Sequence, residues 1–201
     1  MTSAIAINCT LKPSPAESSS ELLARQTLDA LSNHGVQGDI IRAVDHDIRP
    51  GVERDMGDGD AWPQLFDRVR RADILLIATP TWLGHMSSVA QRVLERLDAE
   101  ISRTDDQGRP TMLGKVGMCA VVGNEDGAHK IIADVFGALN DIGFSIAGQG
   151  STYWNDEAMG GRDYKDLETA PSAVVDATSA AARNAAHLAK LLSSQAFPPY
   201  S

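Results

Sequence analysis

Short apolar runs alternate with helical patterns along the chain. The apolar runs predict five strands, at Ala4–Cys9, Asp39–Val44, Ile74–Ala78, Val116–Val122 and Phe144–Ala147. The run at 74–78 is apolar at every position, which is typical of a parallel strand covered by helices on both faces. Apolar residues recur at helical spacing over 90–101, 132–139 and 181–192. The alternation predicts an α/β fold: a single doubly wound, five-stranded parallel sheet with helices on both faces.

The chain of 201 residues has the length of one domain, so we expect a single domain over 1–201 with its core at about 4–192. Two stretches, 46–61 and 151–170, fit no helix or strand and are interpreted as long loops. In the first of them, Asp55, Asp58 and Asp60 lack the spacing of a calcium site, and we expect them to be solvated. A short tail, 194–201, contains two prolines past which a helix cannot continue.

Charge and cysteine content narrow the class of protein. The chain has 18 Lys and Arg against 27 Asp and Glu, a formal net charge of −9, which argues against nucleic acid or an anionic membrane as a partner. No run reaches about 18 apolar residues, so we expect no membrane insertion. Cys9 and Cys119 form no CxxC pair, and the first residues lack the features of a signal peptide. We therefore expect a cytoplasmic protein with no metal site and a buried, unreactive Cys9.

Candidate chemistry lies in the segments that follow the first, third and fourth predicted strands, because open parallel sheets bind ligands at the carboxyl ends of their strands. The first of these segments leads into Ser18-x-x-Glu21, the pattern of a helix capping box. The N-terminus of that helix, the hydroxyl groups of Thr10 and of the serines, and the charge of Lys12 suit a phosphate. The alternative is that the serines only cap the helix.

The other two segments suit a flat heterocycle. In Pro80–Gly84 we expect Trp82 to pack on a ring and Gly84 to let backbone N–H groups approach it. The alternative is that Trp82 and Met86 pack against the following helix. In 124–127 we expect backbone hydrogen bonds to the carbonyl groups of a heterocycle, and the alternative is an ordinary turn with Asp126 as helix N-cap.

Together, the segments Asn8–Lys12, Pro80–Gly84 and Gly123–Ala128 resemble the flavodoxin-like flavoproteins, and more closely their NADPH-dependent FMN reductase and NAD(P)H:quinone oxidoreductase branch. The resemblance covers most of the chain, from Ile5 to about Leu192. It implies the sheet order 2-1-3-4-5 and non-covalently bound FMN. The FMN-binding residues that it implies are Thr10, Lys12, Ser18, Ser19 and Ser20 around the phosphate, Pro80, Thr81, Trp82, Leu83 and Gly84 beside the ring, and Asn124, Glu125, Asp126 and Gly127 at the pyrimidine edge.

The resemblance further implies an FMN-dependent oxidoreductase without a catalytic side chain, assembled as a homodimer or homotetramer. Such an enzyme passes hydride from NADPH or NADH through FMN to a small-molecule acceptor, for example a quinone or free flavin. The T-x-T-G-x-T phosphate loop of electron-carrier flavodoxins is absent, and no GxGxxG fingerprint is complete. Two alternatives stay open: an electron carrier that a partner protein reduces, and a regulatory flavin-binding protein without useful turnover.

Two further expectations concern loops and cations. The 151–170 loop, with Tyr153 and Trp154, either covers the flavin, completes the site of a neighbouring subunit or packs on its own domain. Local cations must offset the net negative charge if anionic NADPH is to bind. The candidates on predicted loops are Lys12, Arg103, Arg109, Lys115, Arg162 and Lys165.

Overall fold

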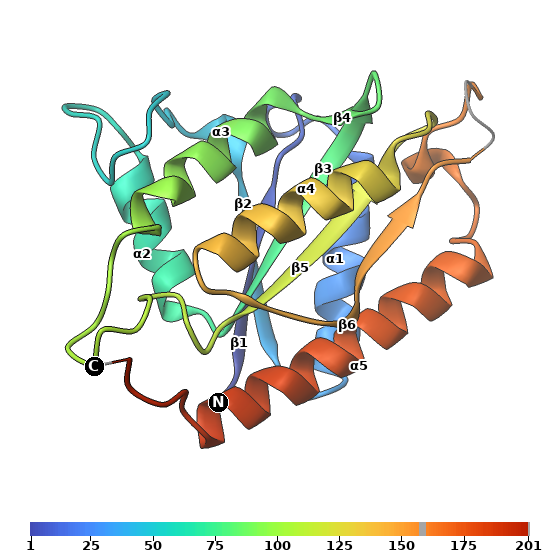
Figure 1. Cartoon of the computed structure of the whole chain (residues 1–201). Helices are drawn as coiled ribbons and strands as arrows, with labels where there is room; N and C mark the ends of the chain where they lie inside the picture. The colour runs from blue at the N-terminus through green and yellow to red at the C-terminus, as the bar shows by residue number, and fades with distance from the viewer. Residues whose placement is uncertain (157–159, 201) are drawn as a thin grey trace.

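The alternation of strands and helices is present in the computed structural model, which describes residues 1–156 and 160–200 (Figure 1). The strands are β1 Ser3–Asn8, β2 Gln37–Arg42, β3 Ile74–Trp82, β4 His85–Met86, β5 Val116–Val122 and β6 Ser145–Trp154. The α-helices are α1 Ser19–Ser32, α2 Trp62–Arg71, α3 Ser88–Leu97, α4 Ala128–Asp141 and α5 Ser172–Ser194. Short 3₁₀-helices occupy Ala43–Asp45, Asp98–Glu100 and Tyr164–Asp166.

The sheet has the order β2-β1-β3-β5-β6, and all of these neighbours pair in parallel. The two-residue strand β4 pairs antiparallel with the end of β3 alone. Counting the parallel strands only, the order is 2-1-3-4-5, so the predicted fold and strand order are confirmed. The chain turns to opposite sides of the sheet after β1 and after β3, and this switch point is where open α/β sheets bind ligands.

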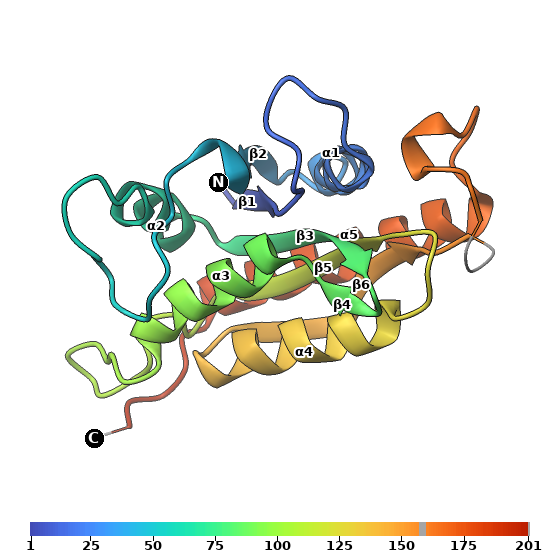
Figure 2. The same cartoon turned by 90° about the horizontal axis from the view of Figure 1, so that it is seen from above.

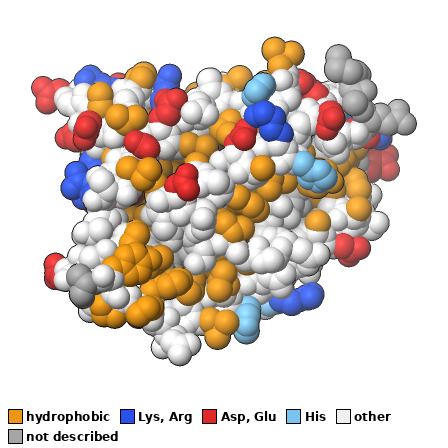
Figure 3. All heavy atoms as spheres, viewed as in Figure 1, with side chains coloured by type: hydrophobic (Ala, Val, Ile, Leu, Met, Phe, Trp, Pro, Cys, Tyr) orange, Lys and Arg blue, Asp and Glu red, His pale blue; other side chains and the backbone are white. Residues whose placement is uncertain are grey.

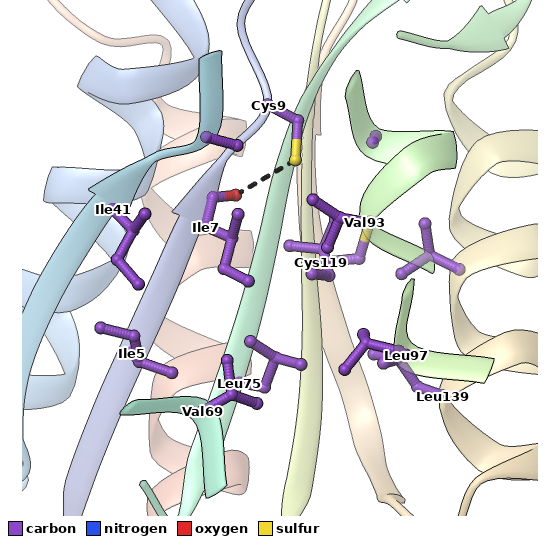
Figure 4. Close-up of a cluster of buried hydrophobic side chains, with 14 of the residues drawn as sticks. Ile5, Ile7, Cys9, Ile41, Val69, Leu75, Val93, Leu97, Cys119 and Leu139 are labelled. Carbon is purple, nitrogen blue, oxygen red and sulfur yellow. Dashed lines mark hydrogen bonds between the residues drawn. The ribbon is translucent and has the colours of Figure 1, made fainter. Parts of the chain in front are cut away.

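Helices cover both faces of the sheet, as predicted (Figure 2). Leucine, isoleucine and valine side chains pack between the sheet and α2, α3 and α4, and Figure 4 shows part of this cluster around Ile7, Leu75 and Val93. On the other face, α1 and α5 pack on the sheet. The face of α5 that meets the sheet is built mainly from alanines, which let this helix lie close to the strands.

Several element boundaries differ from the predicted ones. The predicted strand Phe144–Ala147 is too short, because β6 continues through 151–154, residues wrongly assigned to a loop. Gln149 has φ +56°, and the pairing with β5 shifts register between Gly117 and Cys119. This irregularity interrupts the apolar alternation from which the end of the strand was inferred. Strand β2 begins and ends two residues earlier than predicted. Strand β3 extends beyond its predicted end to Trp82, and α3 ends at Leu97, before the last residue of its predicted apolar stripe.

The 46–61 segment contains no helix or strand, and a buried arginine holds it against α3. Arg96 Nη2 lies 2.8 Å from Asp60 Oδ2, and both side chains are fully buried. Arg96 also donates hydrogen bonds to the carbonyl oxygens of Arg49 and Glu53. The prediction that Asp60 is solvated is therefore wrong, since it anchors the segment to the core.

The described part of the C-terminal tail packs against the loop that precedes β5. Arg109 Nη1 donates to the carbonyl oxygen of Phe197 at 2.9 Å, and the N–H of Tyr200 donates to Gln107 at 3.0 Å. The helix α5 ends before the prolines, as predicted.

Candidate functional site

A cavity of about 150 Å³ opens at the carboxyl edge of the sheet, between the ends of β1, β3 and β5. It brings together most of the predicted site residues: Thr10, Lys12, Ser18, Ser19, Ser20, Pro80, Thr81, Trp82 and Asn124. Its other lining residues are Leu11, Val122, Gly123, Trp154, Asp163 and Tyr164. The predicted residues Leu83, Gly84, Glu125, Asp126 and Gly127 do not line it and belong to the two adjoining loops. The three segments therefore converge, although each contributes fewer residues than expected.

The first wall of the cavity is the N-terminus of α1. Ser18 is the N-cap, and its Oγ accepts a hydrogen bond from the N–H of Glu21 at 3.2 Å, as the capping-box pattern predicts. The reciprocal half of the box is replaced, because the Glu21 carboxylate turns to Asn8, Arg25 and Arg42. The first N–H groups of α1 have no intrahelical acceptor, so this end of the helix offers donors to an anion.

Asn8 orders the hydroxyl groups at this helix end. It is fully buried, and its Oδ1 accepts from the N–H of Thr10 at 3.3 Å and from Ser20 Oγ at 2.9 Å. Ser20 Oγ lies 3.0 Å from Ser18 Oγ, so these two hydroxyls are paired within the chain. Thr10 Oγ1 accepts from the N–H of Lys12, and Ser19 Oγ accepts from the N–H of Lys165. Neither hydroxyl donates to another of the described residues, so both protons can be given to a ligand.

Arg42, at the end of β2, holds the loop that precedes α1. Its Nη1 donates to the carbonyl oxygens of Lys12 at 3.2 Å and Ala16 at 2.8 Å, and its other nitrogens pair with Glu21. Burial acts to raise the pKa of Glu21, but the hydrogen bonds from Arg42 and Arg25 outweigh it and lower that pKa. Glu21 is thus a neutralised anion beside the proposed phosphate position. No local signal in the sequence identifies Arg42, because its partners lie 21 or more positions away.

The second wall is a β-hairpin, where the sequence suggested a loop. β3 continues to Trp82, and Leu83 and Gly84 form a two-residue turn with φ +50° and +74°. A positive φ at both central residues is typical of a type I′ turn. Trp82 is 52% exposed, so it does not pack into the core, whereas Met86 packs against the helix-covered core, as the alternative for this segment expected.

The loop 123–127, which follows β5, approaches the β3–β4 hairpin closely. Gly127 has φ +132°, and a Cβ built on it would lie 2.7 Å from the Cα of Gly84. The N-cap of α4 is Gly127, and Asp126 Oδ1 accepts from the N–H of Gly127 at 2.7 Å, so the alternative that Asp126 is the N-cap is wrong. Asn124 Nδ2 donates to the carbonyl oxygen of Gly160 at 2.7 Å. The glycines thus let the loop 123–127 approach the β3–β4 hairpin closely.

The back wall comes from β6 and the segment after it. The rings of Trp154 and Tyr164 lie 5.4 Å apart, and Tyr164, which is buried, donates its hydroxyl proton to Gln26 of α1 at 2.7 Å. The described part of 151–170 thus packs on its own domain, which was one of the alternatives, and residues 157–159 lie outside the described residues. Tyr153 does not line the cavity and packs edge-on against His129.

Only part of the predicted set of cations lies at this edge. Lys12 lines the cavity, and the N–H of Lys165 contacts Ser19. Lys115 and Arg109 lie at the opposite edge, where Lys115 Nζ donates to two carbonyl oxygens at the end of α2 and Arg109 pairs with Asp105. Arg103 does not line the cavity and lies in the loop between α3 and β5. Arg162 pairs with Asp156. In Figure 3, side chains of both charge signs lie next to one another along the upper, carboxyl edge.

Cys9 lies just below the cavity and is buried among apolar side chains (Figure 4). Its Sγ donates to the carbonyl oxygen of Ile7 at 3.6 Å. Burial, and to a smaller extent the nearby Cys119, raises the pKa of the Cys9 thiol. A thiol with a raised pKa is a poor nucleophile, in agreement with the expectation that Cys9 is unreactive.

The residues around the cavity fit a flavin phosphate. Helix N–H groups, two free hydroxyl protons and Lys12 suit the phosphate at one end, and the exposed indole of Trp82 suits a planar ring at the other. Among the residues described here, no cluster of three or more His, Cys, Asp or Glu side chains is arranged to hold a metal ion. None of the described helices has the length and apolar character needed to span a bilayer.

Two curated proteins are similar to this chain in sequence. A relative from Mycobacterium bovis, described as divalent metal cation transporter MntH, is 41% identical over 167 residues, which are 81% of this chain and 24% of the relative. A relative from Streptomyces davaonensis, described as 8-demethyl-8-aminoriboflavin-5'-phosphate synthase, is 32% identical over 170 residues, 80% of this chain and 66% of the relative. The chain thus spans about a quarter of the first relative and just under two thirds of the second.

Two solved structures extend the comparison. RosB with bound 8-demethyl-8-formylriboflavin-5'-phosphate superposes with a TM-score of 0.89 at 28% identity, covering 98% of this chain and 82% of RosB. An NADH:FMN oxidoreductase in its apo form superposes with a TM-score of 0.63 at 19% identity. The match covers 98% of this chain and 92% of that protein, which shows a shared fold. The family described as NADPH-dependent FMN reductase matches residues 2–157. With this match over most of its length, the chain belongs to the NADPH-dependent FMN reductase family.

Proposed function

We propose that this protein binds FMN non-covalently and is an oxidoreductase that passes hydride from NADPH or NADH to a small-molecule acceptor. The observation that carries the proposal is the cavity at the switch point of the sheet, which joins an anion-binding helix end to an exposed tryptophan. Membership of the FMN reductase family supports the choice of cofactor.

Each part of the site has a role in this proposal. Thr10, Ser19 and Lys12 hold the phosphate together with the first N–H groups of α1, and Asn8 and Arg42 keep these groups in place. Trp82 and the loop 124–127 flank the ring and leave one side open to nicotinamide and acceptor. Bound FMN supplies the two-electron chemistry, so no side chain needs to act as a general acid or base.

The test is the visible spectrum of FMN-loaded protein, recorded anaerobically before and after the addition of NADPH or of NADH. We expect the flavin band to bleach with at least one nicotinamide, and the faster one identifies the physiological donor. A protein that retains FMN but stays oxidised is an electron carrier or a regulatory protein. A protein that retains no FMN contradicts the proposal.

The acceptor is identified by steady-state turnover. We expect a quinone or free flavin to sustain NAD(P)H oxidation, because the half-exposed Trp82 leaves room for a planar molecule. Menadione, free FMN and ferric citrate are compared at equal concentration. Ferric citrate is included because reduction of ferric iron yields a divalent cation, and the Mycobacterium bovis relative is described as a divalent metal cation transporter.

A second candidate function uses the flavin phosphate as substrate. The Streptomyces davaonensis relative is described as a synthase of an 8-amino flavin phosphate, and RosB holds an 8-formyl flavin phosphate. Here the protein would modify the ring that it binds. Mass spectrometry of the flavin recovered after aerobic incubation with FMN and an amino-acid mixture separates the two functions, since an oxidoreductase returns FMN of unchanged mass.

We further propose that the protein works as a homodimer or homotetramer in the cytoplasm, where reduced nicotinamide is available. Leu83, 89% exposed at the tip of the hairpin, and Trp82 next to it give an apolar surface beside the site that a second copy can cover. Size-exclusion chromatography with light scattering measures the mass, and a monomer at micromolar concentration contradicts this part of the proposal.

A further inference from the structure

Cationic side chains near the cavity are few, and most of them are already in ion pairs. Six described cations lie on the segments around it: Lys12, Arg25, Arg42 and Lys165 at the N-terminus of α1, where we propose that the FMN phosphate binds, and Lys130 and Arg162 at the other end, where we propose that the ring binds. Residues 157–159 lie outside the described residues, and none of the three is Lys or Arg. The partners of these six cations therefore decide whether a second anionic substrate finds a free positive charge.

Three of the four cations at the phosphate end are neutralised within the chain. Arg25 and Arg42 share the carboxylate of Glu21. Lys165 Nζ lies 2.6 Å from Asp166 Oδ1. The fourth, Lys12, is the one of the six without a carboxylate partner among the described residues, and the proposed function assigns its charge to the FMN phosphate.

The ring end of the cavity is built from three segments that contact one another: the β3–β4 hairpin, the loop 123–127 with the first two turns of α4, and the described part of 155–163. Lys130 Nζ of α4 lies 3.4 Å from His85 Nδ1 of the hairpin, and Asn124 Nδ2 donates to the carbonyl oxygen of Gly160 at 2.7 Å. In Figure 1, β4, the start of α4 and the end of β6 lie at the same edge of the sheet. Charges on these segments therefore act on the same bound molecule.

Carboxylates outnumber cations at this ring end. Lys130 Nζ lies 2.6 Å from Asp134 Oδ2, and Arg162 Nη2 lies 3.2 Å from Asp156 Oδ2, so both cations are paired. Three further carboxylates on the same segments form no ion pair with the described residues: Glu125, Asp126 and Asp163. Two cations against five carboxylates leave a formal charge of −3 beside the position proposed for the ring.

We propose that the protein uses NADH as its electron donor in preference to NADPH. The two differ by the 2′-phosphate on the adenosine ribose, for which proteins that accept NADPH supply a cation. Here the described cations around the cavity are either paired or assigned to FMN, and the ring end repels an added anion. This inference rests on the proposed function and names the donor for its first half-reaction.

The test is the bleaching of bound FMN, followed anaerobically by stopped flow over a range of NADH and of NADPH concentrations. No acceptor takes part, so the result does not depend on the identity of the acceptor. The solution is kept at about pH 8, where histidine side chains are generally neutral. At about 0.05 M salt we expect the Kd for NADPH to be about 5- to 10-fold that for NADH, with equal limiting rates. The ratio should shrink to about twofold at about 0.5 M salt, because salt screens the repulsion.

Two variants release the paired cations at the ring end. Asp134→Asn frees Lys130, and Asp156→Asn frees Arg162. Neither aspartate belongs to the residues assigned to FMN. In the double variant we expect the Kd for NADPH to fall about threefold more than the Kd for NADH. Asp141→Asn, at the opposite end of α4, is the matched control and should leave the ratio of the two Kd values unchanged.

An equal or lower Kd for NADPH in the unchanged protein overturns the inference and leaves the proposed function standing. A preference for NADH that neither salt nor the double variant reduces also overturns it, because charge would then not be the cause. If neither nicotinamide bleaches the bound FMN, the proposed function fails, and the inference fails with it.

Discussion

Lys12 lines the cavity at the end where we propose that the phosphate of FMN binds, and its side chain is exposed. For Lys12→Gln we expect the Kd for FMN to rise about 5- to 10-fold, because a charge-assisted contact with the phosphate is lost. The Kd for riboflavin should not change. Isothermal titration with both flavins measures the difference, and Lys190→Gln, on the far end of α5, is the control. Equal losses for both flavins would show that Lys12 does not contact the phosphate.

At this scale, the sequence predicts contacts between near neighbours. The spacing Ser18-x-x-Glu21 correctly predicted the N-cap of α1. It did not predict that the Glu21 carboxylate would turn away from the cap, because Arg42 arrives from another strand. Hydrogen bonds over three residues are decided by local geometry, and those between strands depend on the sheet order.

The approach of the β3–β4 hairpin to the loop 123–127 depends on glycine. Gly127→Ala meets the backbone of Gly84 at 2.7 Å and keeps an unfavourable φ of +132°. We expect a loss of about 2–3 kcal/mol in the free energy of unfolding and weaker FMN binding. Urea denaturation measures the first quantity, and FMN titration the second.

Gly137→Ala is the matched control for this prediction. Gly137 lies within α4, where a Cβ meets nothing within 4 Å. This variant should gain about 0.5–1 kcal/mol and bind FMN as before. If both variants lose stability alike, the contact between the two loops is not what requires glycine at 127.

The hairpin itself carries strain at its tip. Leu83 has φ +50° and is 89% exposed, so its side chain gains little from packing. Leu83→Asn should raise the free energy of unfolding by about 0.5–1 kcal/mol, since asparagine tolerates the left-handed region. Leu83→Val should lower it, because β-branching disfavours that region further. Equal urea midpoints for the two variants would contradict a strained turn.

Elements with a regular pattern were predicted well, and irregular ones were not. β5 was predicted with its observed limits, since all seven of its residues are buried. The later half of β6 was missed because its register shift breaks the alternation, and the β3–β4 hairpin was missed because its second strand has only two residues. Periodicity is detectable only where one face is buried without interruption.

For the whole molecule, the buried pair of Arg96 and Asp60 links stability to pH. Burial acts to raise the pKa of Asp60, but hydrogen bonds from Arg96 and from backbone N–H groups lower it well below its ordinary value of 3.8. A carboxyl group with a lower pKa in the folded state stabilises the fold above its unfolded pKa, and this contribution is lost as the pH falls below it. The urea midpoint should therefore drop between about pH 4 and about pH 2.

Asp60→Asn separates this pair from the other carboxyl groups. At about pH 7 it should lose about 3 kcal/mol, because Arg96 keeps a buried charge without its partner. Its midpoint should fall less steeply than that of the unchanged protein in acid. If the urea midpoints of Asp60→Asn and of the unchanged protein fall in parallel with pH, Asp60 does not set the acid sensitivity of the fold.

The sequence by itself determined the class of fold, the strand order through its family resemblance, the cap of α1 and the three segments that meet at the cavity. The tertiary structure alone decided which cations reach that edge: Lys115 and Arg109 lie at the opposite end of the sheet. It also decided that Arg42 supports the loop before α1 and that Asp60 is buried. The physical reason is the distance along the chain over which each kind of interaction acts. Burial periodicity and capping act within a few residues, whereas these contacts join segments that become neighbours only once the sheet is assembled.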